Sequence, residues 1–188
     1  FQDYLENPAK LIFTPSANSK VIHCYKGEKF VVFKKTSTLF EKNESDIKTK
    51  SSTQSGGSVS CLALDVLIQF GCNPIFLIGQ DLSFPSNRIY SSFSNSNKKM
   101  LDNLNHERML KENHNAETRK SKTIKVESIS GNKVETNQAM YSYLRGIEEI
   151  ATINPKTKIY NLCSHGAQID NVTSLGSANE LMKFLNKY

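Results

Sequence analysis

An amphipathic helix followed closely by a short apolar strand is the feature that most constrains the fold of this chain. Apolar residues recur every three or four positions from Val59 to Phe70, which is the spacing of one helix face. Gly71 stands where a glycine often ends a helix, and the apolar run Ile75–Ile78 follows shortly afterwards. Such a run is typical of a parallel strand covered on both faces. Together these segments predict half of an α/β unit.

The second half of the chain continues this alternation of strands and helices. The expected elements are a β-hairpin over 124–135 with its turn at Ser130–Lys133, a helix from Ala139 to Ile150 capped by Thr136 or Asn137, a strand at Lys158–Leu162, and a closing helix that begins at the capping box Ser177–Glu180. Strands that alternate with helices favour the α/β class. We therefore expect a Rossmann-like open sheet with helices on both faces.

The N-terminal part has weaker patterns. We expect a short helix at Phe1–Glu6, an apolar piece at Leu11–Phe13, and strands near Val21–Tyr25 and Lys29–Phe33. The residues from Lys34 to Gln54 are rich in Ser, Thr and Lys, which indicates an exposed connection without a packed face.

The length of 188 residues is that of one domain, so we expect a single Rossmann-like domain over 1–188. Because residue 1 is Phe, we expect this chain to be part of a longer protein. Within it, the composition from Pro85 to Lys122 is strongly polar. Residues 86–122 are therefore expected to form a lid or insertion, and a functional loop and a disordered surface segment both fit this composition.

The charge balance favours anionic partners. There are 24 Lys and Arg against 18 Asp and Glu, a formal net charge of +6, which suits a nucleotide or a sugar phosphate. The lysines are scattered among Ser and Asn rather than grouped with aromatic residues, so no nucleic-acid partner is expected. All apolar runs are far shorter than the roughly 20 residues of a membrane helix, so we expect no membrane insertion.

The cysteines and the absence of certain motifs narrow the functional class of the protein further. The four cysteines include no CxxC and no pair with His at zinc spacing, and the start does not resemble a signal peptide. We therefore expect free thiols, a cytoplasmic protein and no bound metal. The sequence also lacks the motifs of phosphate-loop kinases, zinc proteases and serine hydrolases.

Ligands of open α/β sheets bind beyond the carboxyl ends of the strands, and the loops expected at that edge supply the candidate site. The first loop comprises Ser55, Gly56, Gly57 and Ser58, at the start of the first long helix. Its backbone N–H groups and the positive end of the helix dipole could receive a phosphate or carboxylate. The alternative is an ordinary glycine-rich helix start.

The second loop directly follows the apolar strand and contains Gly79, Gln80 and Asp81. Gly79 would allow a ligand to approach the backbone closely. The Asp81 carboxylate could bind a sugar hydroxyl, orient a catalytic group or hold Mg²⁺. Its alternative role is to cap the next turn by local hydrogen bonds.

The third loop runs from Asn161 to Ala167 and contains His165. A single histidine in a loop is more often a surface residue than a base. His106 and His114 lie in the polar segment, and either could reach the site as a general base if that segment is a lid.

These loops and helices resemble the motility accessory factor (Maf) family of bacterial flagellin glycosyltransferases. The central domain of that family also defines a wider group that includes 6-hydroxymethylpterin diphosphokinase-like proteins. The resemblance is carried by Ser55–Val59, Phe70–Cys72 and Ile75–Leu82, with support from Gly131–Thr136, Tyr160–Asn161 and Gly166–Ile169.

The same segment is more distantly similar to bacterial sialyltransferases that use CMP-sialic acid. That likeness implies a sialyltransferase-like fold in which Ser55, Gly56, Gly57 and Ser58 face the donor and Gly79, Gln80 and Asp81 line the site. The glycine-rich motif that opens the domain in this family is not in the sequence, so the chain would hold the C-terminal part of the domain.

Further roles follow from the same resemblance. His114 stands at a position similar to that of the sialyltransferase base, so Asp81 and His114 are the implied catalytic residues. Tyr90 stands where Maf-like proteins often have a histidine, and Tyr90 and Asn161 are counted with the donor-binding residues. No cofactor beyond the CMP-sugar substrate is implied.

Three functions remain open from the sequence. The resemblance implies metal-independent transfer of a nonulosonic acid, of the pseudaminic or legionaminic type, from a CMP-activated donor to Ser/Thr hydroxyls of flagellin. The second function is a 6-hydroxymethylpterin diphosphokinase-like enzyme in which Asp81 holds Mg²⁺ and ATP. The third is a noncatalytic flagellin-binding module whose lysines dock an acidic partner.

Overall fold

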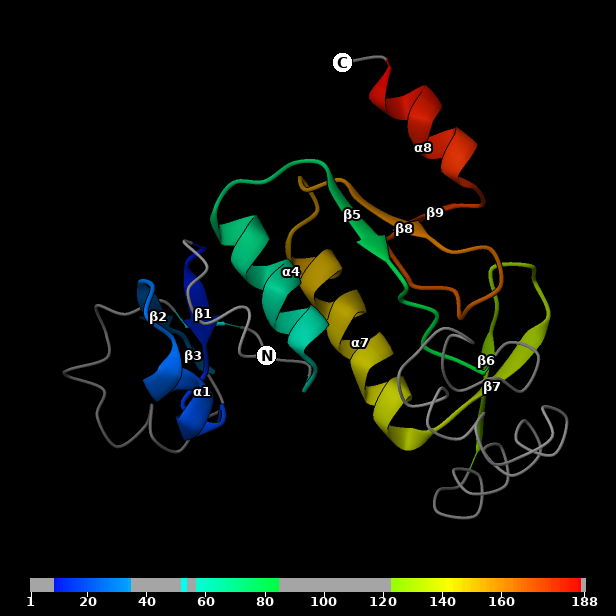
Figure 1. Ribbon diagram of the computed structural model, residues 1–188. Helices are drawn as coiled ribbons and strands as arrows, with labels where there is room; N and C mark the ends of the chain where they lie inside the picture. The colour runs from blue at the N-terminus through cyan, green and yellow to red at the C-terminus, as the bar shows by residue number, and fades with distance from the viewer. Residues whose placement is uncertain (1–8, 35–51, 54–56, 85–122, 187–188) are drawn as a thin grey trace, which may run out of the picture. The chain divides into compact units, whose positions relative to one another are not determined.

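A computed structural model describes residues 9–34, 52–53, 57–84 and 123–186 of the chain (Figure 1). The chain divides into two units, Phe1–Ser55 and Gly56–Tyr188. The expectation that residues 1–188 form a single Rossmann-like domain stays a prediction. The expected helix at Phe1–Glu6 and the expected lid at 86–122 lie outside the described residues.

The first unit is built from short parallel strand pairs. Its elements are β1 (Leu11–Phe13), α1 (Ser19–Cys24), β2 (Lys29–Val31), β3 (Phe33–Lys34) and β4 (Ser52–Thr53). Strand β1 pairs with β2, and β3 pairs with β4, both in parallel. The strand expected at Lys29–Phe33 is therefore present, interrupted at Val32.

The strand expected near Val21–Tyr25 is wrong, because these residues lie in and after helix α1. Asn18 caps this helix by accepting a hydrogen bond from the Lys20 N–H at 2.9 Å. Since β1 and β2 are parallel, the chain between them must cross over, and a helix is the usual crossover. The exposed connection expected at Lys34–Gln54 contains strand β4, which was not predicted.

The second unit contains a parallel sheet with the strand order β5-β8-β9. The elements of this sheet and its helices are α4 (Val59–Gln69), β5 (Ile75–Ile78), α7 (Gln138–Ile153), β8 (Ile159–Leu162), β9 (Thr173–Leu175) and α8 (Ala178–Leu185). Residues Ile75–Ile78 stand opposite Ile159–Leu162 in register. The predicted α/β class and the parallel strand at Ile75–Ile78 are confirmed.

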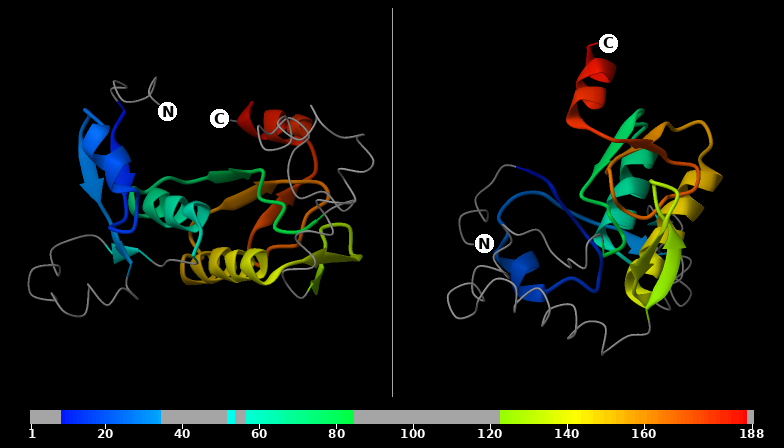
Figure 2. Two further views of the ribbon diagram at one scale, coloured as in Figure 1. Left: turned by 60° about the horizontal axis from the view of Figure 1, so that its bottom comes forward. Right: turned by 90° about the vertical axis from the view of Figure 1, so that its right-hand side faces the viewer.

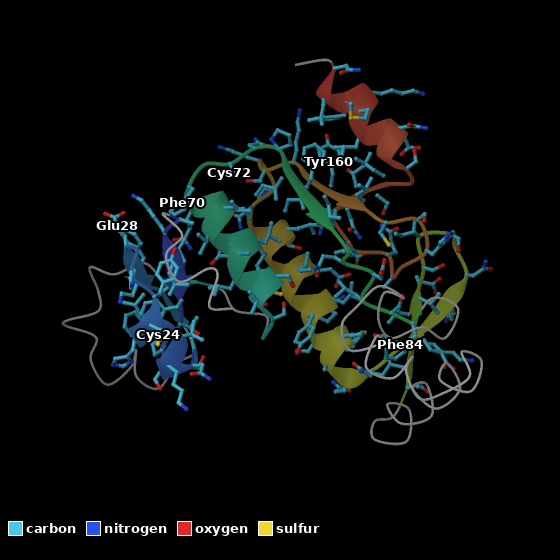
Figure 3. All side chains as sticks on the ribbon, viewed as in Figure 1. Cys24, Glu28, Phe70, Cys72, Phe84 and Tyr160 are labelled. Carbon is cyan, nitrogen blue, oxygen red and sulfur yellow. The ribbon has the colours of Figure 1, made fainter. Side chains whose placement is uncertain are left out.

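Helices cover both faces of this sheet. On one face, α4 and α7 lie side by side (Figure 1) and bury Leu64 and Ile147 against Ile75 and other core residues. On the other face, the ring of Phe184 from α8 lies 4.9 Å from that of Tyr160, measured between centroids. Tyr160 also stacks on Phe76, and Figure 3 shows Tyr160 on the α8 side of the sheet. Figure 2 shows α8 and α7 at opposite sides of the strands.

A separate β-hairpin contacts the loop that leaves the carboxyl edge of this sheet. Strands β6 (Ile124–Glu127) and β7 (Lys133–Thr136) are antiparallel, and Gly131 in their turn has a φ of +82°. The hairpin touches the loop after β8 through a bridge between Ser128 and Ala167. The predicted hairpin and its glycine turn are confirmed.

The predicted helix caps are also confirmed. The side chains of Ser58, Asn137 and Ser177 accept hydrogen bonds from the backbone N–H groups of Cys61, Met140 and Glu180. At the far end of α4, Gly71 has a φ of +78°, as expected for a glycine that ends a helix.

Two features of the sheet differ from the prediction. Ile78, at the end of β5, is 69% exposed, so this strand is not covered over its whole length. Strand β9 was not predicted, because its three residues Thr-Ser-Leu have no apolar pattern and depend on pairing with β8. None of the helices in the described ranges combines the length and apolarity needed to pass through a bilayer.

A buried carboxylate ties α7 to the turn before β9. Glu148 is only 5% exposed; its Oε2 lies 2.6 Å from Nη1 of Arg145, and its Oε1 accepts a hydrogen bond from the Asp170 N–H at 3.1 Å. Burial is the largest influence on the pKa of Glu148 and raises it. The hydrogen bond from the Asp170 N–H and the positive charge of Arg145 lower this pKa, while the negative charge of Asp170 raises it. Proton uptake by Glu148 is therefore easier in the folded state.

This raised pKa predicts a pH-dependent stability. Relative to the unfolded chain, whose glutamate has a pKa of 4.5, the folded state binds a proton more tightly. The contribution of Glu148 is therefore most favourable below pH 4.5 and is lost as the pH rises through the folded-state pKa. We therefore expect the free energy of unfolding to decrease less in Glu148→Gln than in the wild type as the pH rises above 4.5. Urea denaturation at several pH values measures this free energy. Glu149→Gln, which removes the neighbouring exposed carboxylate, is the control. If the free energy of unfolding changed with pH equally in the two variants, the prediction would be contradicted.

Candidate functional site

The loops that follow β5 and β8 leave the sheet side by side. Because the two strands are parallel and Ile78 stands opposite Leu162, Gly79 and Cys163 are the first residues beyond the same edge. Two of the predicted loops, Gly79–Asp81 and Asn161–Ala167, are therefore brought together at this carboxyl edge. This is the edge at which open α/β sheets bind ligands.

At this edge the carboxylate of Asp81 contacts the thiol of Cys163. The Cys163 Sγ donates a hydrogen bond to Oδ1 of Asp81 at 2.8 Å. Cys163 is 6% exposed, whereas Asp81 is exposed. Burial raises the pKa of the Cys163 thiol, and the hydrogen bond to Asp81 raises it further. Backbone hydrogen bonds from His165 and Gly166 to the sulfur act in the opposite direction.

The backbone of Asp81 is packed directly against the second loop. The Ala167 N–H donates to the Asp81 carbonyl oxygen at 2.8 Å. A Cβ added to Gly166 would lie 2.6 Å from that same oxygen and 2.7 Å from the Asp81 Cα. Only a residue without a side chain fits at position 166, since such distances are below ordinary van der Waals contact.

The residue after Asp81 has a strained backbone. Leu82 is a buried residue with a φ of +51°, which is uncommon for any residue other than glycine. Its carbonyl oxygen accepts a hydrogen bond from the buried Thr136 Oγ1 at 2.8 Å. Two residues on, the Phe84 N–H donates to the Glu135 carbonyl at 2.8 Å. Strand β7 therefore holds the chain in the turn that presents Asp81.

Asn161 lies beneath the loop rather than at its surface. Its side chain is fully buried, and its Nδ2 donates to the Gln80 carbonyl oxygen at 3.2 Å. Its Oδ1 has no hydrogen-bond donor among the residues that the structure describes. The contact supports the Gln80 backbone, and the prediction that Asn161 binds a donor directly stays untested.

The start of α4 contacts α7. Gly57 has a φ of +86°, and a Cβ placed on it would lie 3.6 Å from the Tyr143 ring. The Ser58 Oγ accepts from the Cys61 N–H at 3.1 Å and lies 2.7 Å from the Ser60 Oγ. These are the contacts of a helix cap. Because α4 leads directly into β5, its start points toward the carboxyl edge of the sheet, where its dipole would favour an anion.

Several predicted site residues lie outside the described part of the chain: Ser55, Gly56, Tyr90, His106 and His114. The structure brings Gly79, Gln80 and Asp81 together with Cys163 at the sheet edge. His165 is in the same loop as Cys163 and is exposed. In the described ranges, no three His, Cys, Asp or Glu side chains gather in a way that could hold a metal ion.

This site also includes Cys163, Gly166 and Thr136, which were not predicted from the sequence as site residues. Cys163 could have been noticed, because it is the first residue after a predicted parallel strand, as Gly79 is after β5. Gly166 gave a weaker signal as a glycine in the same loop. Thr136 gave none beyond its place next to a helix cap, since its partner Leu82 is 54 positions away along the chain.

Comparisons with known proteins agree with the predicted resemblance. Residues 1–87 match the family model described as 6-hydroxymethylpterin diphosphokinase MptE-like. The fold is similar to the solved structure of the MAf glycosyltransferase from Magnetospirillum magneticum AMB-1, with a TM-score of 0.60 and 17% sequence identity. A search of curated proteins found no match.

The structural likeness covers 96% of this chain and 25% of the Magnetospirillum chain. This chain therefore spans about a quarter of the length of that protein. The resemblance to the Maf and MptE-like group and the α/β fold are confirmed. At this identity the likeness to the solved structure shows the fold.

The close packing of Gly166 predicts a specific loss of stability. We expect Gly166→Ala to lower the free energy of unfolding by about 1–3 kcal/mol, because the new methyl group overlaps the Asp81 backbone. Gly176→Ala is the control, since its Cβ would meet nothing closer than the Glu180 Oε1 at 3.8 Å. Urea denaturation measures both variants, and equal stability of the two would show that the loops are not packed as described.

Proposed function

We propose that this chain forms part of the donor-binding region of a Maf-type glycosyltransferase. In this proposal, the enzyme transfers a nonulosonic acid of the pseudaminic or legionaminic type from a CMP-activated donor to Ser/Thr hydroxyls of flagellin in the cytoplasm. The observation that carries the proposal is the exposed Asp81 carboxylate, held at the carboxyl edge of a parallel strand pair. The likeness of the fold to a MAf glycosyltransferase supports it.

The edge of the sheet has the chemistry that a nucleotide-sugar needs. An ionised carboxylate accepts hydrogen bonds only, so Asp81 suits the hydroxyl groups of a ribose or a sugar. The start of α4, with Gly57 and Ser58, suits the phosphate or the sugar carboxylate of the donor. The net charge of +6 favours the same anionic ligand.

The proposed reaction needs a base and stabilisation of the leaving group. The acceptor hydroxyl oxygen forms a bond to the anomeric carbon, the bond from that carbon to the CMP phosphate oxygen breaks, and the hydroxyl proton passes to a base. His114 is the proposed base on sequence grounds alone. Asp81 orients the reacting sugar, and the start of α4 stabilises the departing phosphate.

A pterin diphosphokinase-like function is the second candidate. The match of residues 1–87 to the MptE-like family model favours it. In such an enzyme Asp81 would supply one carboxylate ligand to the Mg²⁺ that accompanies ATP. The two candidates therefore differ in the nucleotide that they bind and in their need for a divalent cation.

The state of the four cysteines supports a cytoplasmic location. Cys24, Cys61, Cys72 and Cys163 are all unpaired. Free thiols are the usual state in a reducing compartment.

Isothermal titration of the chain with CMP, and separately with ATP and Mg²⁺, tests the proposal. We expect CMP to bind without a metal, and Asp81→Asn to weaken this binding about tenfold or more, because the variant replaces a charged acceptor. Asp170→Asn is the matched control, since it removes an exposed carboxylate from the turn before β9.

The other outcomes distinguish the alternatives. Binding of ATP only in the presence of Mg²⁺ would support the diphosphokinase-like function instead. Absence of binding to either nucleotide would contradict both and would favour a noncatalytic module that binds flagellin. Equal weakening of CMP binding in Asp81→Asn and Asp170→Asn would contradict a specific role for Asp81.

A further inference from the structure

We propose that Cys163 is a positioning residue for Asp81. Its thiol donates a hydrogen bond to one carboxylate oxygen and so fixes the direction of the carboxylate that contacts the nucleotide. This inference rests on the proposed function, because it takes Asp81 to be the residue that meets the ligand.

The contact leaves half of the carboxylate available. Sγ of Cys163 lies 2.8 Å from Oδ1 of Asp81. Among the described residues, no hydrogen bond is made to Oδ2 of Asp81. The sulfur is buried while Asp81 is exposed. One oxygen is therefore held from the protein side, and the other can accept a hydrogen bond from a ligand hydroxyl.

The surroundings of the sulfur fix the direction of this hydrogen bond. A carboxylate oxygen can only accept a hydrogen bond, so the thiol of Cys163 is the donor to Oδ1 of Asp81. Burial and the neighbouring carboxylate raise the pKa of Cys163, which keeps the thiol protonated at neutral pH. A buried, protonated thiol is unsuited to nucleophilic catalysis.

The thiol is not needed to hold the loop itself. The backbone at this point is already fixed by the Ala167 N–H on the Asp81 carbonyl and by the Thr136 hydroxyl on the Leu82 carbonyl. What these contacts leave free is the side-chain rotation of Asp81. The specific contribution of Cys163 is therefore to the orientation of the carboxylate, and its removal is expected to affect ligand binding more than the path of the loop.

CMP affinity and stability, measured together on one set of variants, test this role. We expect Cys163→Ala to weaken CMP binding about threefold to tenfold. Cys163→Ser keeps a proton donor and is expected to restore most of the affinity. Cys72→Ala is the matched control, because it removes a partly buried thiol that packs against the core beyond the end of α4, away from Ser58. Its expected effect is a loss of stability in urea with CMP affinity unchanged.

An infrared measurement without ligand tests the hydrogen bond directly. The S–H stretching band of Cys163 is identified by subtracting the spectrum of Cys163→Ala from that of the wild type. A hydrogen bond to a carboxylate lowers the frequency of this band. We expect Asp81→Asn to move it to higher frequency, because the amide oxygen is a weaker acceptor. A band that does not move would overturn the inference.

The combined results separate the two proposals. If the wild type binds CMP and Cys163→Ala binds it equally well, the positioning role is wrong and the proposed function stands. If Ala and Ser at position 163 weaken binding to the same extent, the positioning role is also wrong. If the wild type binds no CMP, the proposed function is wrong and the positioning role falls with it, even where the infrared band shows the hydrogen bond.

Discussion

Parallel pairing of β5 with β8 is the interaction on which the rest of the second unit depends. It sets Ile78 opposite Leu162, so the loops that follow both strands leave the same edge of the sheet. Gly166 has no side chain, so the loop after β8 can pack directly against the backbone of Asp81 in the loop after β5. On the buried face, α4 and α7 cover the strands with apolar residues such as Leu64 and Ile147. The sheet therefore presents polar residues such as Asp81 at the carboxyl edge of β5 and β8.

Where local signals were strong, the sequence predicted the fold well. The spacing of apolar residues and the caps at Ser58, Asn137 and Ser177 were sufficient to predict α4, α7 and α8. The segment Val21–Tyr25 was wrong because its β-branched residues favour a strand locally, while the parallel pairing of β1 with β2 requires a crossover. Strand β9 was missed because only its partner β8 makes it a strand.

The candidate site was predictable from topology but not in its contacts. Asp81 follows an apolar strand, so the rule for open sheets was sufficient to select it. Its hydrogen bond with Cys163 joins residues 82 positions apart along the chain. The left-handed backbone of Leu82 and its support by Thr136 have no local signal either. The direction in which the carboxylate points is therefore a property of the folded edge, which composition and spacing do not encode.

The measurement that tests the account most directly is an amide chemical-shift map of the ¹⁵N-labelled chain titrated with CMP. Binding at the carboxyl edge predicts that the largest shifts fall on residues 79–82 and 163–167 and on the start of α4. The amides of Asp170 and Asn171, in the turn before β9, are expected to stay unchanged. Shifts centred on that turn, or no saturable shifts at all, would contradict a nucleotide site at the edge formed by β5 and β8.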